Sequence, residues 1–263
     1  MNPIKSGSAN PIKFGATALS TLFLLAACSG SSSGPSSSGR TVGFQLATKA
    51  AVAAPTQAAL AGQEILTAGS DTIVVTGVQL VLRQIELERA GGAACDTSLA
   101  GDDCEELKVG ATLLDLPLGA GAQRSFTVAV DTGSFAKLKF EIHAPSSHDD
   151  TTFVAQHPGF DGVSVMVTGT YNGTPFTYTS DLDVEQEYSL NPPLVVTETT
   201  GANLTLFVDL SSWFLNQTAD GLLDPAQANK GGTYEGEVKC NIEQSLNAFE
   251  DDNHDGHDDH SQG

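Results

Sequence analysis

The C-terminal tail carries side-chain donors at a spacing that could hold a cation. Carboxylate or amide oxygens recur from Asp251 at every second residue, a glycine follows the third of them, and a further carboxylate comes three residues later. Oxygen ligands at this spacing can converge on one hard cation, and the glycine permits the sharp turn that brings back the rest of the loop. The pattern predicts a weak calcium site formed by Asp251, Asn253, Asp255 and Asp259.

The run from Asp251 to Gly256 is similar to the Asp-x-Asn-x-Asp-Gly loops of EF-hands, dockerins and thrombospondin type 3 repeats. That resemblance implies calcium as the ligand. At the twelfth position, where an EF-hand has a bidentate glutamate, this chain has Gln262. The departure implies an affinity in the range of extracellular modules, roughly 0.1–1 mM.

Two other interpretations of the tail stay open. His254, His257 and His260 recur every three residues, and imidazole suits zinc, copper or nickel. Alternatively, the six acidic residues and three histidines of residues 250–260 form a solvated tail that binds nothing specific.

A second group of candidate ligands lies in the middle of the chain. His143, His148 and His157 fall near Asp149 and Asp150 in a region rich in loop residues. Three histidines could meet around zinc, but their spacing matches no known zinc pattern. The spacing favours histidines on surface loops.

Motifs for catalysis are incomplete. Asp131-Thr132-Gly133-Ser134 matches the short signature of aspartic proteases, in which two carboxylates share a proton, yet no second such motif occurs. We expect this segment to be a turn between strands, and we expect no catalytic residues and no enzymatic activity. A hydrolase that uses Asp131, completed by a second copy of the chain, is the alternative from another class.

Aromatic side chains support a different alternative, a carbohydrate-binding surface. Trp213 could stack on a sugar ring, although the single tryptophan of such a domain more often fills the edge of the core. The other aromatics considered for this surface are Tyr171, Phe176 and Tyr178.

The N-terminus predicts export and a lipid anchor. Lys5 and Lys13 precede an apolar stretch of about 14 residues, which is too short to span a bilayer but typical of a signal peptide. Leu25-Ala26-Ala27-Cys28 resembles the lipobox of bacterial lipoproteins. The resemblance implies that residues 1–27 are removed and that Cys28 receives lipid, including palmitate.

Residues 28–40 then read as a lipidated Ser/Gly tether, because they include no apolar side chain that could be buried. In the lipoproteins that this segment resembles, an aspartate directly after the cysteine often retains the protein in the inner membrane, and this chain has Ser29 at that position. We therefore expect a protein of the cell envelope, held at the outer membrane rather than the inner membrane.

The charge of the chain restricts its partners. Lysines and arginines number 12 against 32 acidic residues, and loss of Lys5 and Lys13 leaves a net charge of −22. Phosphate recognition needs basic clusters, so nucleic acid is excluded as a partner. Besides the membrane, reached through the lipid, we expect an envelope protein or a polysaccharide.

Three cysteines remain after Cys28 is assigned to the lipid. Cys95 and Cys104 bracket a loop, and in an oxidising compartment we expect them to form a disulfide that leaves Cys240 free. Pairing of Cys240 with either of them stays open as an alternative.

The region from residue 41 to residue 249 predicts one domain that is mainly β. Short runs rich in Val, Ile, Leu, Phe and Thr alternate with turn residues, which is typical of an antiparallel β-sandwich, immunoglobulin- or transthyretin-like. A helix is expected from about Thr233, with Val238, Ile242, Leu246 and Phe249 on one face. The predicted strands are 72–89, 113–116, 125–130, 136–143, 162–171, 175–180, 194–198 and 203–210.

The long strand within 72–89, the Leu114-Asp115-Leu116 run and the paired strands around Gly133 resemble uncharacterised β-domains of bacterial lipoproteins. The likeness implies the fold and no particular activity.

Overall fold

The computed structural model describes residues 41–48, 62–91, 104–107, 110–119, 123–252 and 258–260, and of 104–107 and 123–125 it describes the backbone alone. Cys28 and Cys95 lie outside these residues, as does the side chain of Cys104. The lipid attachment and the disulfide therefore stay predictions. Among the residues described, no helix combines the length and the apolar character that a membrane span requires.

The fold consists of two β-sheets with helices at their margins, as the sequence predicts. The smaller sheet has the order β12 (Leu246–Glu250), β11 (Ala202–Val208), β1 (Thr41–Thr48) and β6 (Gln123–Ala129). β1 pairs with β11 in parallel, while the other two pairings are antiparallel. A parallel pair needs a long crossover connection, and the whole larger sheet lies between β1 and β11 in the chain.

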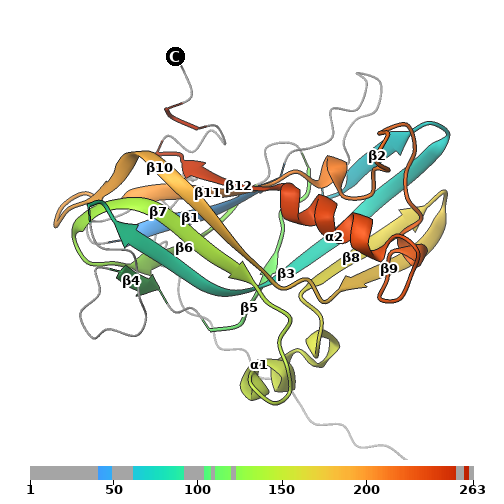
Figure 1. The fold of residues 1–263 in the computed structure, drawn as a ribbon, viewed down its shortest axis with the longest axis horizontal. Coiled ribbons are helices and arrows are strands. Elements are labelled where there is room, and N and C mark those ends of the chain that lie inside the picture. The colour runs from blue at the N-terminus through green and yellow to red at the C-terminus, as the bar shows by residue number, and fades with distance from the viewer. Residues whose placement is uncertain are drawn as a thin grey trace, which may run out of the picture. The chain divides into compact units, whose positions relative to one another are not determined.

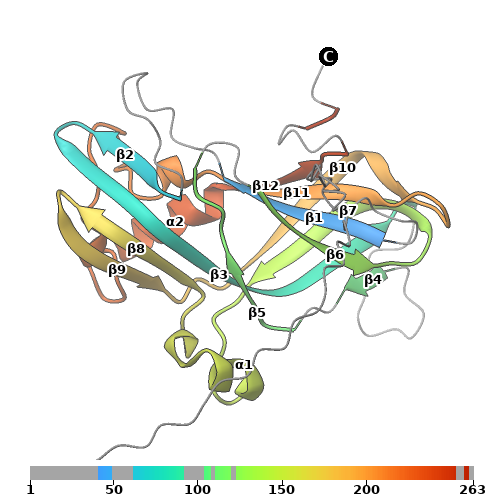
Figure 2. The ribbon, with the colours of Figure 1, turned by 180° about the vertical axis from the view of Figure 1, so that it is seen from behind.

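The larger sheet is organised around β3 (Asp71–Arg89), the longest strand of the described chain. Figures 1 and 2 view the two sheets from opposite sides, with β10 and β7 nearer the viewer in Figure 1 and β1 and β6 nearer in Figure 2. The other strands of this sheet are β2 (Glu64–Ala68), β4 (Cys104–Leu107), β5 (Thr112–Asp115), β7 (Gly133–Ile142), β8 (Val165–Tyr171), β9 (Thr174–Ser180) and β10 (Val184–Val196).

One edge of β3 is shared by two strands. β8 pairs with residues 73–80 and β7 with residues 82–89, whereas β2, β5 and β4 follow one another along the opposite edge. The partner of this edge changes from β8 to β7 at Val81. The Val81 N–H donates to the Ser164 carbonyl just before β8, and the Val81 carbonyl accepts from the His143 N–H just after β7 at 3.1 Å. The chain therefore leaves the sheet after β7 and returns to it at β8 beside the middle of β3.

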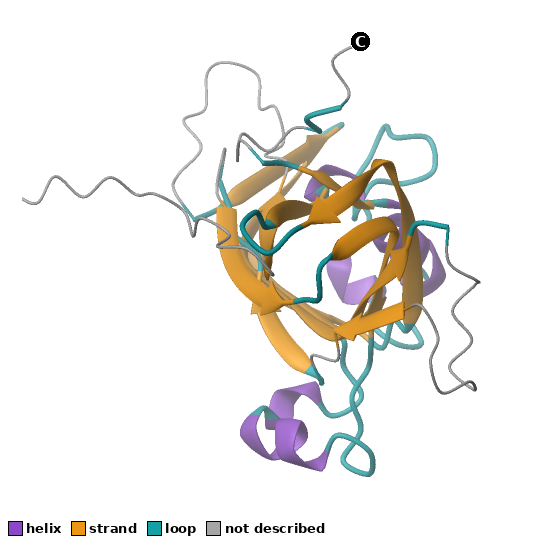
Figure 3. Ribbon diagram, turned by 90° about the vertical axis from the view of Figure 1, so that its left-hand side faces the viewer, coloured by secondary structure: helices purple, strands orange, loops and turns teal. Residues whose placement is uncertain are grey.

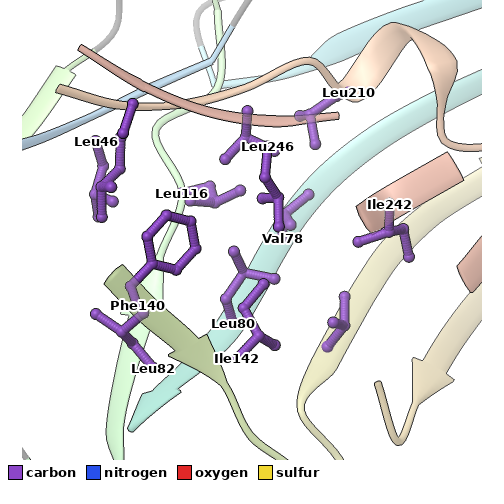
Figure 4. Close-up of a cluster of buried hydrophobic side chains, with 14 of the residues drawn as sticks. Leu46, Val78, Leu80, Leu82, Leu116, Phe140, Ile142, Leu210, Ile242 and Leu246 are labelled. Atoms are coloured by element: carbon purple, nitrogen blue, oxygen red, sulfur yellow. The ribbon is translucent and has the colours of Figure 1, made fainter. Parts of the chain in front are cut away.

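The core lies between the sheets. β7 shows how the sequence specifies it: Leu138, Phe140 and Ile142 are buried, while Lys137 and Lys139 alternate with them on the wetter face. This confirms the alternation expected of a strand with one solvated face. Figure 4 shows the inward side chains of several strands meeting with Ile242 of the C-terminal helix.

The C-terminal helix is shorter than predicted. α2 (Glu235–Gln244) buries Val238 and Ile242, but the chain then turns into β12. The prediction that Leu246 and Phe249 continue the helix is wrong. Over so short a run, the apolar positions fit the helical period and the strand period alike. Pairing with β12 also gives the backbone groups at the edge of β11 hydrogen-bond partners, which a continued helix could not supply.

Ion pairs connect α2 and the segment before it to Asp181, which directly follows β9. The Nζ atom of Lys239 lies 2.5 Å from a carboxylate oxygen of Asp181 and 2.7 Å from one of Glu235, and Lys230 reaches Asp181 at 2.8 Å. Hydrogen bonds from Lys230 and Lys239 lower the pKa of Asp181 to about 2. Asp181 therefore keeps its charge, and its contacts with both lysines, well into acidic pH.

The remaining short elements are α1 (Thr151–Gln156) and the 3-10 turns η1 (Pro158–Phe160), η2 (Leu210–Ser212) and η3 (Pro225–Gln227). Figures 1 and 3 show α1 and η1 standing away from the two sheets, on the excursion between β7 and β8. The predicted Asn172-Gly173 hairpin is confirmed: both residues have positive φ between β8 and β9.

Candidate metal centre

The point where β7 leaves the sheet brings together one histidine, three carboxylates and an arginine. Glu141 is near the end of β7, and His143 comes two residues later, just after the strand. Asp183 directly precedes β10, which pairs with β7. Arg83 is the extra residue of a β-bulge in β3, where Leu82 and Gln84 oppose neighbouring residues of β7. Asp150 immediately precedes α1.

The Nδ1 atom of His143 faces the centre of this group. It lies 3.3 Å from Nη1 of Arg83, 3.5 Å from Oδ2 of Asp183 and 3.8 Å from Oε1 of Glu141. Ligand atoms of Glu141, His143 and Asp183 all lie within 4.8 Å of one another. These three residues and Arg83 are called the His143 cluster below.

Asp150 fixes the imidazole from the other side. Its Oδ2 lies 3.0 Å from Nε2 of His143 and also accepts from the Ser146 N–H at 3.3 Å. A guanidinium can only donate hydrogen bonds, so Nδ1 accepts from Arg83 and Nε2–H donates to Asp150. The lone pair of Nδ1 is therefore directed at the Arg83 guanidinium, on the side of the ring where the carboxylates of Glu141 and Asp183 also lie.

This arrangement matches that of a metal-binding histidine. Such histidines generally donate their second ring N–H to a carboxylate, which sets the tautomer and the ring orientation. Two ligand atoms about 2.0–2.2 Å from a tetrahedral ion are roughly 3.3–3.6 Å apart. The separations of 3.5 and 3.8 Å from Nδ1 need little adjustment to fit. One nitrogen and two oxygens would leave further coordination positions vacant.

Burial divides the cluster into a rigid and an open side. The side chains of His143 and Asp150 are 11% and 13% exposed, whereas those of Arg83 and Asp183 are 44% and 57% exposed. The imidazole is therefore held in place from within the protein, while the face with the open coordination positions meets solvent.

The histidines singled out in the sequence do not converge. His148 is exposed and hydrogen-bonded to Asp149 at 2.7 Å, which raises the pKa of His148 and lowers that of Asp149. The ring of His157 packs against Phe153, with ring centroids 4.8 Å apart. His143 is the one member of the three that joins a candidate ligand group within the described residues.

The cluster contains residues that sequence reasoning missed. Glu141 and His143 stand two apart at the end of a strand, so they share one face, and this signal was present in the sequence. Asp183 is brought in by the pairing of β10 with β7, and Arg83 by the bulge in β3. Neither contact can be read from spacing along the chain.

The predicted calcium ligands of the tail are only partly described. Asn253 and Asp255 lie outside the described residues. Asp251 is fully buried and its Oδ2 accepts from Thr205 Oγ1 at 2.8 Å. Asp259 returns to the sheet, where its Oδ2 accepts from the Asp252 N–H at 2.6 Å. The two ends of the loop therefore meet, and its calcium site stays a prediction.

Two other expectations can be compared with the structure. Asp131 is exposed and lies with Thr132 in the connection between β6 and β7, as expected, whereas Gly133 and Ser134 of the motif already belong to β7. Cys240 is exposed on α2 and carries a free thiol, as expected if the other two cysteines pair.

The aromatic surface proposed for carbohydrate binding is not present as expected. Trp213 is 1% exposed and Tyr178 is fully buried, while Tyr171 and Phe176 pack against the core. Trp213 and Tyr178 therefore belong to the hydrophobic core and cannot stack on a sugar, and Tyr171 and Phe176 are only partly accessible.

The fold and the site define a β-sandwich domain with a histidine–carboxylate cluster at the exit of one strand. No protein-family model matches the chain, and no curated protein matches it either. Among solved structures, MbnP from Methylosinus trichosporium is similar at a TM-score of 0.40 and 10% identity. The similarity covers 81% of this chain and 99% of that one.

Proposed function

We propose that this chain is a cell-envelope protein with a binding role, in which the His143 cluster holds a divalent transition-metal ion. The observation that carries the proposal is the geometry of His143: Asp150 holds one ring nitrogen at 3.0 Å, and the other faces Glu141 and Asp183. Mixed imidazole and carboxylate ligands favour zinc and other first-row transition metals over calcium.

The open face supports binding and exchange of the ion. Three protein ligands leave vacant positions, and Asp183 is the most exposed of them. An ion could enter from solvent or pass to a partner through this side, without rearrangement of the buried His143. The acidic character of the chain favours attraction of cations to it.

Zinc titration by calorimetry should show one saturable site that depends on His143. We expect His143→Ala to weaken zinc binding by about 100-fold or more, because it removes the only nitrogen ligand of the cluster. Asp150→Asn should weaken it by about 10–100-fold, the usual effect of losing a carboxylate behind a metal-bound histidine.

His148→Ala is the matched control, because it removes an exposed histidine of the same loop that lies outside the cluster. It should bind zinc as the unaltered protein does. Equal zinc affinities for His143→Ala and the unaltered protein would refute the site.

Calcium in the tail is a second and separate proposal, supported by the closure of the loop between Asp252 and Asp259. In the same calorimeter, calcium should bind with a dissociation constant of roughly 0.1–1 mM. Asp255→Ala, which removes the oxygen ligand altogether, should abolish this signal, and His143→Ala should leave it unchanged. Absence of saturable calcium heat would leave the tail as a solvated segment.

We propose Cys28 as the lipid anchor and the outer membrane as the place where it holds the domain, on the strength of the Leu25–Cys28 sequence. Radiolabelled palmitate should mark the protein. Cys28→Ala should lose the label and move the protein out of the membrane fraction. A Cys28→Ala protein that still sediments with membranes would contradict this anchoring.

A further inference from the structure

Arg83 occupies the position at which a cation would sit in the His143 cluster. Its Nη1 lies 3.3 Å from the Nδ1 atom of His143 and 3.7 Å from Oε1 of Glu141. The bulge between Leu82 and Gln84 is what presents the side chain here, because a bulge gives the strand an extra residue and re-aims its side chains.

The guanidinium and a metal ion cannot use the same lone pair. Nδ1 has one lone pair, which either accepts a hydrogen bond from Arg83 or binds a metal ion. Repulsion between the guanidinium and a divalent ion acts in the same direction. Because its side chain is 44% exposed, Arg83 can move into solvent without unfolding β3.

We propose that Arg83 is an internal counter-cation: it neutralises the carboxylates of the metal-free cluster, is displaced when a divalent ion binds, and so determines the affinity of the site. This inference rests on the metal site proposed above and adds the residue that sets how tightly the ion is held. The protein would then have two states. In the metal-free state the Arg83 side chain lies inside the cluster, and in the metal-bound state it lies outside.

The test compares zinc affinities of the lipoprotein purified in detergent, without a histidine tag. Arg83→Gln should bind zinc about tenfold more tightly than the unaltered protein, because the competing charge is gone. Arg83→Lys should bind with an affinity closer to the unaltered protein, since a cation remains.

Lys137→Gln is the matched control for net charge. Lys137 lies on β7, the strand of Glu141, and pairs with Glu88 and Glu187. It is four residues from Glu141 and six from His143, which is roughly 13–20 Å along a strand. Its substitution should change zinc affinity by less than about twofold if proximity to the cluster is what matters.

A second measurement covers the case in which Arg83→Gln does not fold. The side-chain Nε–H resonance of Arg83, assigned by its loss in Arg83→Lys, should shift in proportion to zinc occupancy as the guanidinium leaves the cluster. An unshifted resonance at saturating zinc would overturn the displacement.

The outcomes separate the two proposals. Equal or weaker zinc binding by Arg83→Gln, with His143-dependent binding intact, would overturn the role of Arg83 and leave the metal site standing. Absence of His143-dependent zinc binding in the unaltered protein would overturn both.

Discussion

Replacing Trp213 by alanine should lower the free energy of unfolding by about 3–5 kcal/mol, the usual cost of removing a buried tryptophan. Trp213 is 1% exposed, and its Nε1–H donates to Ser245 Oγ at 2.7 Å. Its carbonyl accepts from the side chain of Asn241 at 3.1 Å. The residue therefore joins the segment after β11 to both α2 and the start of β12.

Urea unfolding followed by circular dichroism measures this effect, because the variant lacks the single tryptophan that fluorescence would report. Trp213→Phe should cost less than alanine, since it keeps an aromatic ring and loses mainly the bond to Ser245. Val195→Ala, at a side chain that is 54% exposed, should stay within about 0.5 kcal/mol of the unaltered protein. A similarly small loss for Trp213→Ala would contradict its place in the core.

Adding one methyl group at Gly169 should destabilise the larger sheet by about 2–3 kcal/mol, in the range of overpacked cores. A Cβ at this position would lie 2.1 Å from the carbonyl oxygen of Val74 on β3. The obstacle is backbone that is hydrogen-bonded in the sheet, so it cannot rotate aside as a side chain could. The close approach occurs beside the irregular pairing of β3 and β8 at Val75 and Gly77.

Gly236→Ala is the matched control, because it adds the same methyl group on α2 where nothing lies within 4 Å. Alanine is the better helix former, so this variant should be neutral or more stable by up to about 1 kcal/mol. Chemical unfolding of the two variants should therefore give changes of opposite sign or of clearly different size. Equal free energies of unfolding for the Gly169→Ala and Gly236→Ala variants would contradict the close approach of β8 to β3 at Gly169.

Local pattern was enough to predict most strands. Leu138, Phe140 and Ile142 alternate with charged residues because side chains of a strand point to opposite faces, and Asn172-Gly173 forms the hairpin because both residues tolerate positive φ. Such preferences act within a few residues, so they can be read along the chain. The helix boundary at Gln244 was missed because the following apolar residues suit a strand as well.

The aromatic residues show a second limit of pattern. Trp213 and Tyr178 have both an apolar ring and a polar atom, so their types are compatible with a sugar-binding surface and with the core. Their burial follows from the packing of η2, α2 and β9. The tertiary structure therefore decided between two roles that the sequence left open, and for Trp213 it chose the core position that is the commoner one.

The sequence by itself determined the β-rich class, the acidic charge, the predicted anchor at Cys28 and the presence of His143 near Asp150. Only the tertiary structure placed Asp183 and Arg83 beside that histidine, because strand pairing and a bulge act between segments that are distant in the chain. A ligand set depends on which side chains converge within a few ångströms, and that convergence is a property of register. The candidate metal centre could therefore be recognised only after β3, β7 and β10 were paired.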